Sequence, residues 1–180
     1  RVDYKRAKTI FNKIEDDLCR IYRHFLDNDN DYGERVCIKL IKPRCADSDR
    51  FERELLANDP LYLLTPTNTP GYPEDAINFL QNDMVHRKKF FTDKGEGEVE
   101  IRVSITKPEV HIENSGKTGL LMEHLKLNQG ISFVRACREI EHGSFGYCNG
   151  YDPRERWWGV EVRFPPVLDE LFGVPNNKQT

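Results

Sequence analysis

Apolar residues recur at every third or fourth position near the start of the chain. The repeat runs through Ala7, Ile10, Phe11, Ile14, Leu18, Ile21, Tyr22 and Phe25. This spacing lines up one face of a helix, so the pattern predicts a single amphipathic helix over 3–26. Asp3 is its candidate N-cap. Three basic residues near its end suit the negative pole of the helix dipole: Arg20, Arg23 and His24.

A strict alternation of apolar and polar residues over 98–106 is the clearest strand signal in the chain. We expect one set to face a core: Val99, Ile101, Val103 and Ile105. We expect the alternate set to face outward: Glu100, Arg102 and Ser104. The segment is therefore predicted to be a half-buried strand of an antiparallel sheet.

The remaining elements rest on shorter patterns. Strands are predicted at 35–42, 61–64 and 157–164, and on both sides of a tight turn at Ala136–Cys137. A helix is predicted over 117–127, with Leu121, Met122 and Leu125 as core residues. A short helix is predicted over 167–172, with Pro165 and Pro166 before it and Gly173 as its stop.

Three further segments have less regular patterns. We predict a short helical or irregular piece at 51–56, and a helix followed by a strand at 76–91. The stretch 65–73 holds three prolines and a glycine, so it is predicted to be a loop.

Helices and strands interleave irregularly along the chain, and the strongest pairing signal is antiparallel. This combination predicts an α+β fold: a mixed, mainly antiparallel sheet with helices packed on one face, preceded by one long helix. We divide the chain into residues 1–33, the helix and an acidic turn, and residues 34–180, the α+β domain. The helix begins almost at once after Arg1, so we expect this chain to be a piece of a longer protein.

Composition narrows the classes of protein to which this chain can belong. The 180 residues are 38% hydrophobic and 32% charged, enough for a domain with a real core. The net charge of −3 gives no broad attraction to nucleic acid or to an anionic membrane. No apolar run approaches the ~20 residues of a membrane span. The cysteines are odd in number and widely spaced, which favours reduced thiols in a cytoplasmic protein. They are Cys19, Cys37, Cys45, Cys137 and Cys148.

Two stretches look like ligand loops but fail on spacing. The acidic run at 27–31 would need Gly at Tyr32 and Glu at Ile38 to form an EF-hand loop. Gly116-Lys117-Thr118 looks like the end of a phosphate loop, but His111 stands where that motif needs glycine. No Ser/His/Asp or Cys/His set can be inferred from spacing, and no metal site is predicted.

Three sequence pieces follow one another in the C-terminal third. They are Phe133-Val-Arg-Ala-Cys-Arg-Glu-Ile140, then Gly159-Val-Glu-Val-Arg-Phe164, then a loop with Asn177-Lys178-Gln179. Over 128–180 this order resembles the second domain, the transducer, of the GHKL ATPases, the superfamily of gyrase B, MutL and the MORC proteins. In the MORC branch the hairpin carries two arginines and the loop contains Asn-Lys-Gln. Gyrase B and MutL place a lysine in the equivalent loop.

The resemblance implies a role for each of these residues. Lys178 would be the catalytic residue that contacts the γ-phosphate of ATP, with Gln179 and Asn177 in support. A lysine ammonium is a compact charge that neutralises charge building up on a transferring phosphoryl group. Arg135 and Arg138 are expected to make structural or partner contacts.

The resemblance also implies what lies outside this segment. The fold would be of the transducer type, similar to a ribosomal protein, and the long helix would end or follow an ATP-binding domain upstream in the same protein. ATP and Mg²⁺ would be cofactors of the whole protein, and ATP would drive the formation of a homodimer. The Asn- and Asp-Gly-containing boxes that bind Mg²⁺ and adenine do not occur here, and Cys137 replaces the usual turn residue. The segment alone is therefore expected to be inactive.

A second hypothesis is a non-enzymatic α+β module that binds a protein or a nucleic acid. Arginines near aromatic residues can stack on bases and contact phosphates. The set is Arg135, Arg138, Arg154, Arg156 and Arg163, with Phe133, Trp157 and Trp158. The negative net charge ranks this hypothesis second. A third class, an independent hydrolase or metal enzyme, has no constellation of residues behind it.

Overall fold

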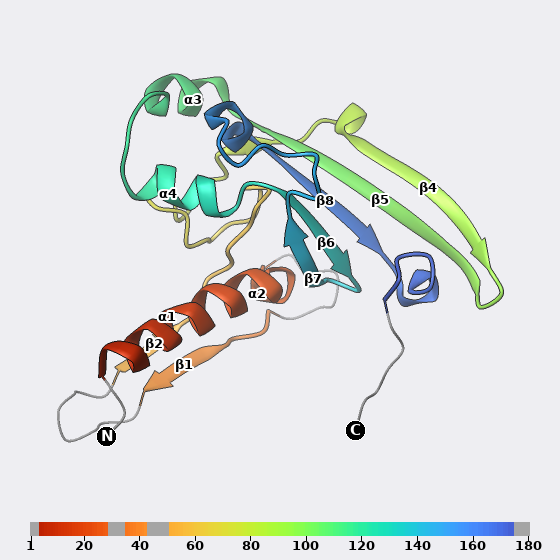
Figure 1. Ribbon diagram of the computed structural model, residues 1–180, viewed down its shortest axis with the longest axis horizontal. Helices are drawn as coiled ribbons and strands as arrows, with labels where there is room; N and C mark the ends of the chain where they lie inside the picture. The colour runs from red at the N-terminus through yellow and green to blue at the C-terminus, as the bar shows by residue number, and fades with distance from the viewer. Residues whose placement is uncertain (1–3, 29–34, 43–50, 175–180) are drawn as a thin grey trace.

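A computed structural model describes residues 4–28, 35–42 and 51–174 of the chain. Helices and a mixed, mostly antiparallel sheet make an α+β fold, which confirms the predicted fold class. In Figure 1 the N-terminal helical part lies beside a small two-stranded sheet, and a long hairpin extends from the larger sheet. None of the helices in the described ranges is long and apolar enough to cross a membrane.

The predicted N-terminal helix is present with one break near its end. It forms α1 (Tyr4–Ile21) and, after Tyr22, the single-turn α2 (Arg23–Leu26). The small sheet pairs β1 (Lys39–Lys42) antiparallel with β2 (Phe51–Glu54). Apolar residues from these parts of the chain form one buried cluster: Cys19, Leu26, Leu55 and Ala57. The last turns of the apolar helix face are thereby covered, whereas Ile10 and Ile14 earlier on α1 are 51% and 41% exposed.

The larger sheet has six strands in the order β3-β5-β8-β6-β7, and β4 also pairs with β5. The strands are β3 (Asn78–Phe79), β4 (Val85–Thr92), β5 (Gly95–Thr106), β6 (Ile131–Arg135), β7 (Arg138–Gly143) and β8 (Trp158–Phe164). Neighbouring strands are antiparallel except β6 and β8, which run parallel. β8 is therefore an inner strand, with β5 on one side and β6 on the other.

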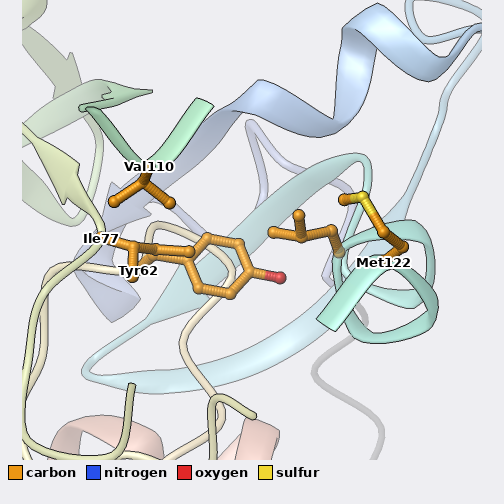
Figure 2. Packing of buried hydrophobic residues seen from close by; sticks show 5 residues of the cluster. Tyr62, Ile77, Val110 and Met122 are labelled. Carbon is orange, nitrogen blue, oxygen red and sulfur yellow. The ribbon is translucent and has the colours of Figure 1, made fainter. Parts of the chain in front are cut away.

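Short helical elements connect the strands. They are α3 (Pro108–Asn114), α4 (Leu120–Leu127) and the 3₁₀ turns η1 (Asn82–Met84), η2 (Pro153–Trp157) and η3 (Pro166–Leu168). α4 is the helix predicted over 117–127. Figure 2 shows its Met122 near Tyr62, with Ile77 and with Val110 of α3. Leu125 completes this buried cluster and Leu121 packs against it, so the predicted core residues of α4 are confirmed.

β5 forms as predicted and Val99 is buried as expected, but the predicted faces are wrong toward the end of the strand. Ser104 has no exposed surface, whereas Ile101 and Ile105 are 38% and 40% exposed. The hydroxyl of Ser104 donates to the carbonyl of Leu61 at 2.8 Å and accepts from the Asn78 amide at 3.0 Å. The polar face is buried here because the segment around Leu61 packs on it and satisfies its hydrogen bonds.

The strand predicted at 61–64 is also wrong. Tyr62 has a φ of 54°, which is left-handed and cannot continue a strand. The carboxylate of Asp59 accepts the backbone N–H groups of Leu61 and Leu63 at 3.0 and 2.8 Å. An aspartate that binds the backbone just after itself favours a turn over a sheet ladder.

Two other predictions need correction. The piece predicted to be helical or irregular at 51–56 begins with strand β2, which pairs with β1. The helix predicted at the start of 76–91 is absent, because β3 and the single turn η1 take its place. The strand predicted after it is confirmed as β4. The strand predicted over 35–42 forms only at its end, as β1.

Candidate functional site: the carboxyl ends of β6 and β8

The parallel strands β6 and β8 end at the same edge of the sheet, where Arg135 is the register partner of Phe164. The predicted hairpin turn follows Arg135 directly. Ala136 and Cys137 both have left-handed φ values, 46° and 63°, as a two-residue type I′ turn requires. The backbone N–H of Ala136 donates to the carbonyl of Phe164 at 3.3 Å, which fixes the turn to the end of β8.

Arg135 holds the segment that follows β8. Its Nε and Nη2 atoms donate to the two carboxylate oxygens of Asp169 at 2.6 and 2.7 Å. The hydrogen bonds from Arg135 lower the pKa of Asp169 below its usual value, because they stabilise the carboxylate. A bidentate pair fixes orientation as well as distance. Arg135 therefore anchors the stretch between η3 and the C-terminal residues.

That stretch ends where the sequence predicts. Gly173 has a φ of 64°, and the N–H of Val174 donates to the carbonyl of Asp169 at 2.9 Å. This is the Schellman arrangement that a glycine stop favours. Val174 packs against the buried cluster of Val99, Val162, Phe164 and Leu168. The stretch that follows β8 is therefore attached to the sheet as far as Val174.

The three residues expected to contact ATP lie outside the described residues. Asn177, Lys178 and Gln179 follow Val174 within 175–180, so the structure does not place them. The two hairpin arginines take separate directions. Arg135 binds Asp169, whereas the guanidinium of Arg138 lies 5.7 Å from the ring centroid of Tyr22, between α1 and α2.

A cluster of buried charges joins the N-terminal helical part to the sheet. Arg23 has no exposed side-chain surface. Its Nη2 atom donates to Glu161 of β8 at 2.5 Å, and its Nη1 atom donates to Glu139 of β7 at 2.7 Å. The hydroxyl of Ser132 accepts from Arg23 at 2.6 Å. Arg20 adds a bond to Glu139 at 2.6 Å. One helix end is thereby connected to β6, β7 and β8.

In this cluster, nearby positive charges together have a larger effect on the pKa of Glu161 than burial does. Burial alone opposes the ionisation of Glu161, but Arg23, His24 and Arg163 hold its pKa well below the usual 4.5. His24 Nε2 lies 3.0 Å from the same carboxylate, and Arg163 donates its Nε–H to the other oxygen. Glu161 is therefore a carboxylate at neutral pH.

A cavity of about 290 Å³ lies beside the hairpin turn. Arg163 and Cys137 line it together with two carboxylates, Glu98 and Glu100. Two acidic groups make this cavity a poor fit for a polyphosphate. Within the described part of the chain, no group of three or more His, Cys, Asp or Glu side chains is placed to hold a metal ion. We therefore assign no Mg²⁺ or ATP contact to these residues.

Comparison of the chain with protein-family models, with curated proteins and with solved structures gives no significant match.

Sequence reasoning missed the buried cluster and the partner of Arg135. Arg23 was expected to interact with the negative pole of the helix dipole, but its guanidinium forms ion pairs with Glu139 and Glu161. No partner was predicted for Arg135, and the structure pairs it with Asp169, the neighbour of Glu170. The two carboxylates diverge to separate partners, Arg135 and Lys94. One signal was available: Glu161 stands between Val160 and Val162 in a predicted strand, and a charge that is buried there requires a partner.

Proposed function

We propose that this chain is the transducer segment of a GHKL-type ATPase, which senses bound ATP through Lys178 and couples nucleotide state to domain or subunit movement. The order of motifs in the C-terminal third supports the proposal. One structural observation carries it further. β8 contains Glu161, which Arg23 holds, and leads directly into the segment that Arg135 holds.

That observation gives the proposal a physical connection. In the proposed whole protein, α1 and α2 follow or end the ATP-binding domain. Arg23 binds them to β8, and the Arg135–Asp169 pair binds the end of β6, the parallel neighbour of β8, to the stretch before Lys178. Packed strands that are hydrogen-bonded to the segments on both sides transmit displacement, because they do not deform easily. Movement of the ATP-binding domain would therefore shift the segment that carries the lysine.

Lys178 supplies the chemistry in this proposal. Its ammonium group would neutralise the γ-phosphate charge, with Gln179 and Asn177 as additional donors. ATP and Mg²⁺ would be held by the upstream domain of the same protein, and two copies would associate when ATP is bound. We further propose a cytoplasmic location. None of the cysteines that the structure describes forms a disulfide, in keeping with a reducing compartment.

Nucleotide binding separates the γ-phosphate role from other roles. The protein would be prepared with its proposed upstream domain, and its affinity for ADP and for a non-hydrolysable ATP analogue would be measured. If Lys178 contacts only the γ-phosphate, Lys178→Ala should weaken the binding of the ATP analogue by about tenfold or more and leave the affinity for ADP unchanged. Lys94→Ala, which removes an exposed lysine paired with Glu170, is the matched control.

An equal loss of affinity for both nucleotides, or no loss of affinity for either, would overturn the proposed role of Lys178. If the extended protein binds no nucleotide at all, the whole ATPase proposal fails. The non-enzymatic interaction module then becomes the better explanation of the chain.

A further inference from the structure

A second cavity, of about 220 Å³, lies at the opposite end of β8 from Phe164 and the hairpin turn. Its walls come from the end of α3, the turn after it and η2, which directly precedes β8. β8 has seven residues, so the two ends of the strand are about 20 Å apart at ~3.3 Å per residue. This cavity is therefore separate from the edge of the sheet where Arg135 binds Asp169.

The lining of this cavity carries positive charge and no negative charge. Lys117, Arg154 and Arg156 contribute to it, and none of its lining residues is acidic. The chain as a whole has a net charge of −3, so a cavity lined only by cations is a local feature. Cavities of one sign concentrate ligands of the opposite sign.

The nearby carboxylates leave much of this charge unneutralised. Asp152 pairs with Arg154 at 2.6 Å, and this pair keeps the pKa of Asp152 at about 2. Glu113 lies 3.9 Å from Lys117, at the limit of an ion pair between exposed groups. Arg156 has no ion pair with any residue in the described ranges, and its buried Nε has no acceptor there. Arg156 is therefore the cation best placed to bind an external anion.

Aromatic and apolar side chains line the same cavity as these cations. Trp157 and His111 meet edge to face, with ring centroids 4.7 Å apart, and Met122 of the main core also lines the cavity. Gly116, at a φ of 77°, also lines the cavity, and open space lies beside it because a Cβ there would meet no atom within 4 Å. The site thus combines cationic donors with an aromatic surface, which suits an anion attached to a small organic group.

We propose that this cavity is a binding site for a small phosphate monoester. Arg156 and Lys117 bind the phosphate group, and the wall formed by Trp157 contacts the organic part. A phosphate monoester carries up to two charges and several acceptor oxygens, which match guanidinium and ammonium donors. The site is independent of the ATP-sensing role, because none of its residues lies near the Arg135–Asp169 anchor.

Phenyl phosphate is a suitable probe, with phenol as its uncharged match. The indole N–H of Trp157 and the backbone amides of 115–117 would be followed by NMR during titration of the whole chain. We expect saturable shifts with phenyl phosphate and none with phenol. Arg156→Gln and Lys117→Gln should each weaken binding by about tenfold, the effect of one charge-assisted contact. Lys126→Gln on α4, outside the cavity, should leave binding unchanged.

Lys117 is exposed, so its replacement tests the site even if Arg156→Gln fails to fold. Absence of saturable shifts, or equal affinity in all variants, overturns the proposal. A single-stranded oligonucleotide without terminal phosphate serves as the competing probe. If it shifts the same resonances at lower concentration than phenyl phosphate, the cavity is part of a nucleic-acid surface and the monoester site is refuted.

Discussion

Arg23 Nη2 lies 2.5 Å from Glu161 Oε2, and neither side chain has any surface exposed to solvent. The arginine belongs to the N-terminal helical part and the glutamate to an inner strand of the sheet. Two charges removed from water destabilise a fold unless each is paired and hydrogen-bonded. Here Glu139, Ser132 and Arg163 complete the network. The pair therefore specifies how the helix docks on the sheet.

We expect Arg23→Met to reduce the free energy of unfolding by about 3–5 kcal/mol, because it removes the fully buried partner that Glu139 and Glu161 share. Urea denaturation of the chain measures this difference. Arg53→Met is the control: Arg53 is 54% exposed and pairs with Glu15 at 2.6 Å, so its loss should cost less than about 1 kcal/mol. Similar losses in the two variants would contradict the structural role assigned to Arg23.

Gly159 marks the closest approach of β8 to the segment beneath it. A Cβ added at this position would lie 2.4 Å from the carbonyl oxygen of Pro60, which is backbone and cannot rotate away. We expect Gly159→Ala to destabilise the chain by about 1–3 kcal/mol through overpacking. Gly150→Ala, where a Cβ meets no atom within 4 Å, should be close to neutral. Thermal unfolding of both variants checks this, and equal melting temperatures would be incompatible with the packing described.

His124 should make stability depend on pH below neutrality. Burial lowers its pKa from 6.5 to about 4, and its Nε2 atom lies 3.2 Å from the amide nitrogen of Asn128, which can only donate. Because the folded-state pKa is the lower one, this contribution is complete above about pH 6.5 and is lost as the pH falls to about 4.

The stability difference between wild type and His124→Gln isolates this effect. It should decrease by about 3 kcal/mol between about pH 7 and pH 4, since one pKa unit corresponds to about 1.4 kcal/mol. Denaturant titrations at several pH values provide the measurement. A difference that stays constant with pH would show that His124 is not the titrating group.

The strand β5 shows how far periodicity leads. Alternation over 98–106 is a local property, so it predicted the strand correctly. Which face is buried depends on what packs there, and that was not in the local pattern. The segment near Leu61 supplies a carbonyl acceptor to Ser104 and covers the polar face, while Ile105 is left partly exposed. Burial of a strand face is decided by distant residues.

The candidate site likewise has local features that could be predicted from the sequence and long-range contacts that could not. The turn at Ala136–Cys137 and the stop at Gly173 follow from local residue patterns, and both were predicted. The pairs Arg23–Glu161 and Arg135–Asp169 join residues separated by 138 and 34 positions. Spacing along one sequence carries no information on such contacts. The roles of Lys178 and its neighbours rest on resemblance and stay predictions.

The Arg135–Asp169 pair can be tested by a double-mutant cycle. Arg135→Gln, Asp169→Asn and the double variant should give a coupling energy of about 1–2 kcal/mol, moderate because Arg135 is 33% exposed. In the proposed whole protein, each single variant should also slow ATP hydrolysis, because the segment before Lys178 loses its anchor. Arg138→Gln, which removes the neighbouring arginine over Tyr22, should leave hydrolysis near the wild-type rate. Additive stability losses would argue against the anchor.

The rate of ATP hydrolysis after Lys178→Ala, measured in the protein with its proposed upstream domain, tests the central claim most directly. The account predicts that wild type hydrolyses ATP and that the variant loses about a hundredfold or more, as expected when a group that stabilises transition-state charge is removed. Lys94→Ala should retain the wild-type rate. An inert wild type, or a Lys178→Ala variant as active as wild type, would contradict the account.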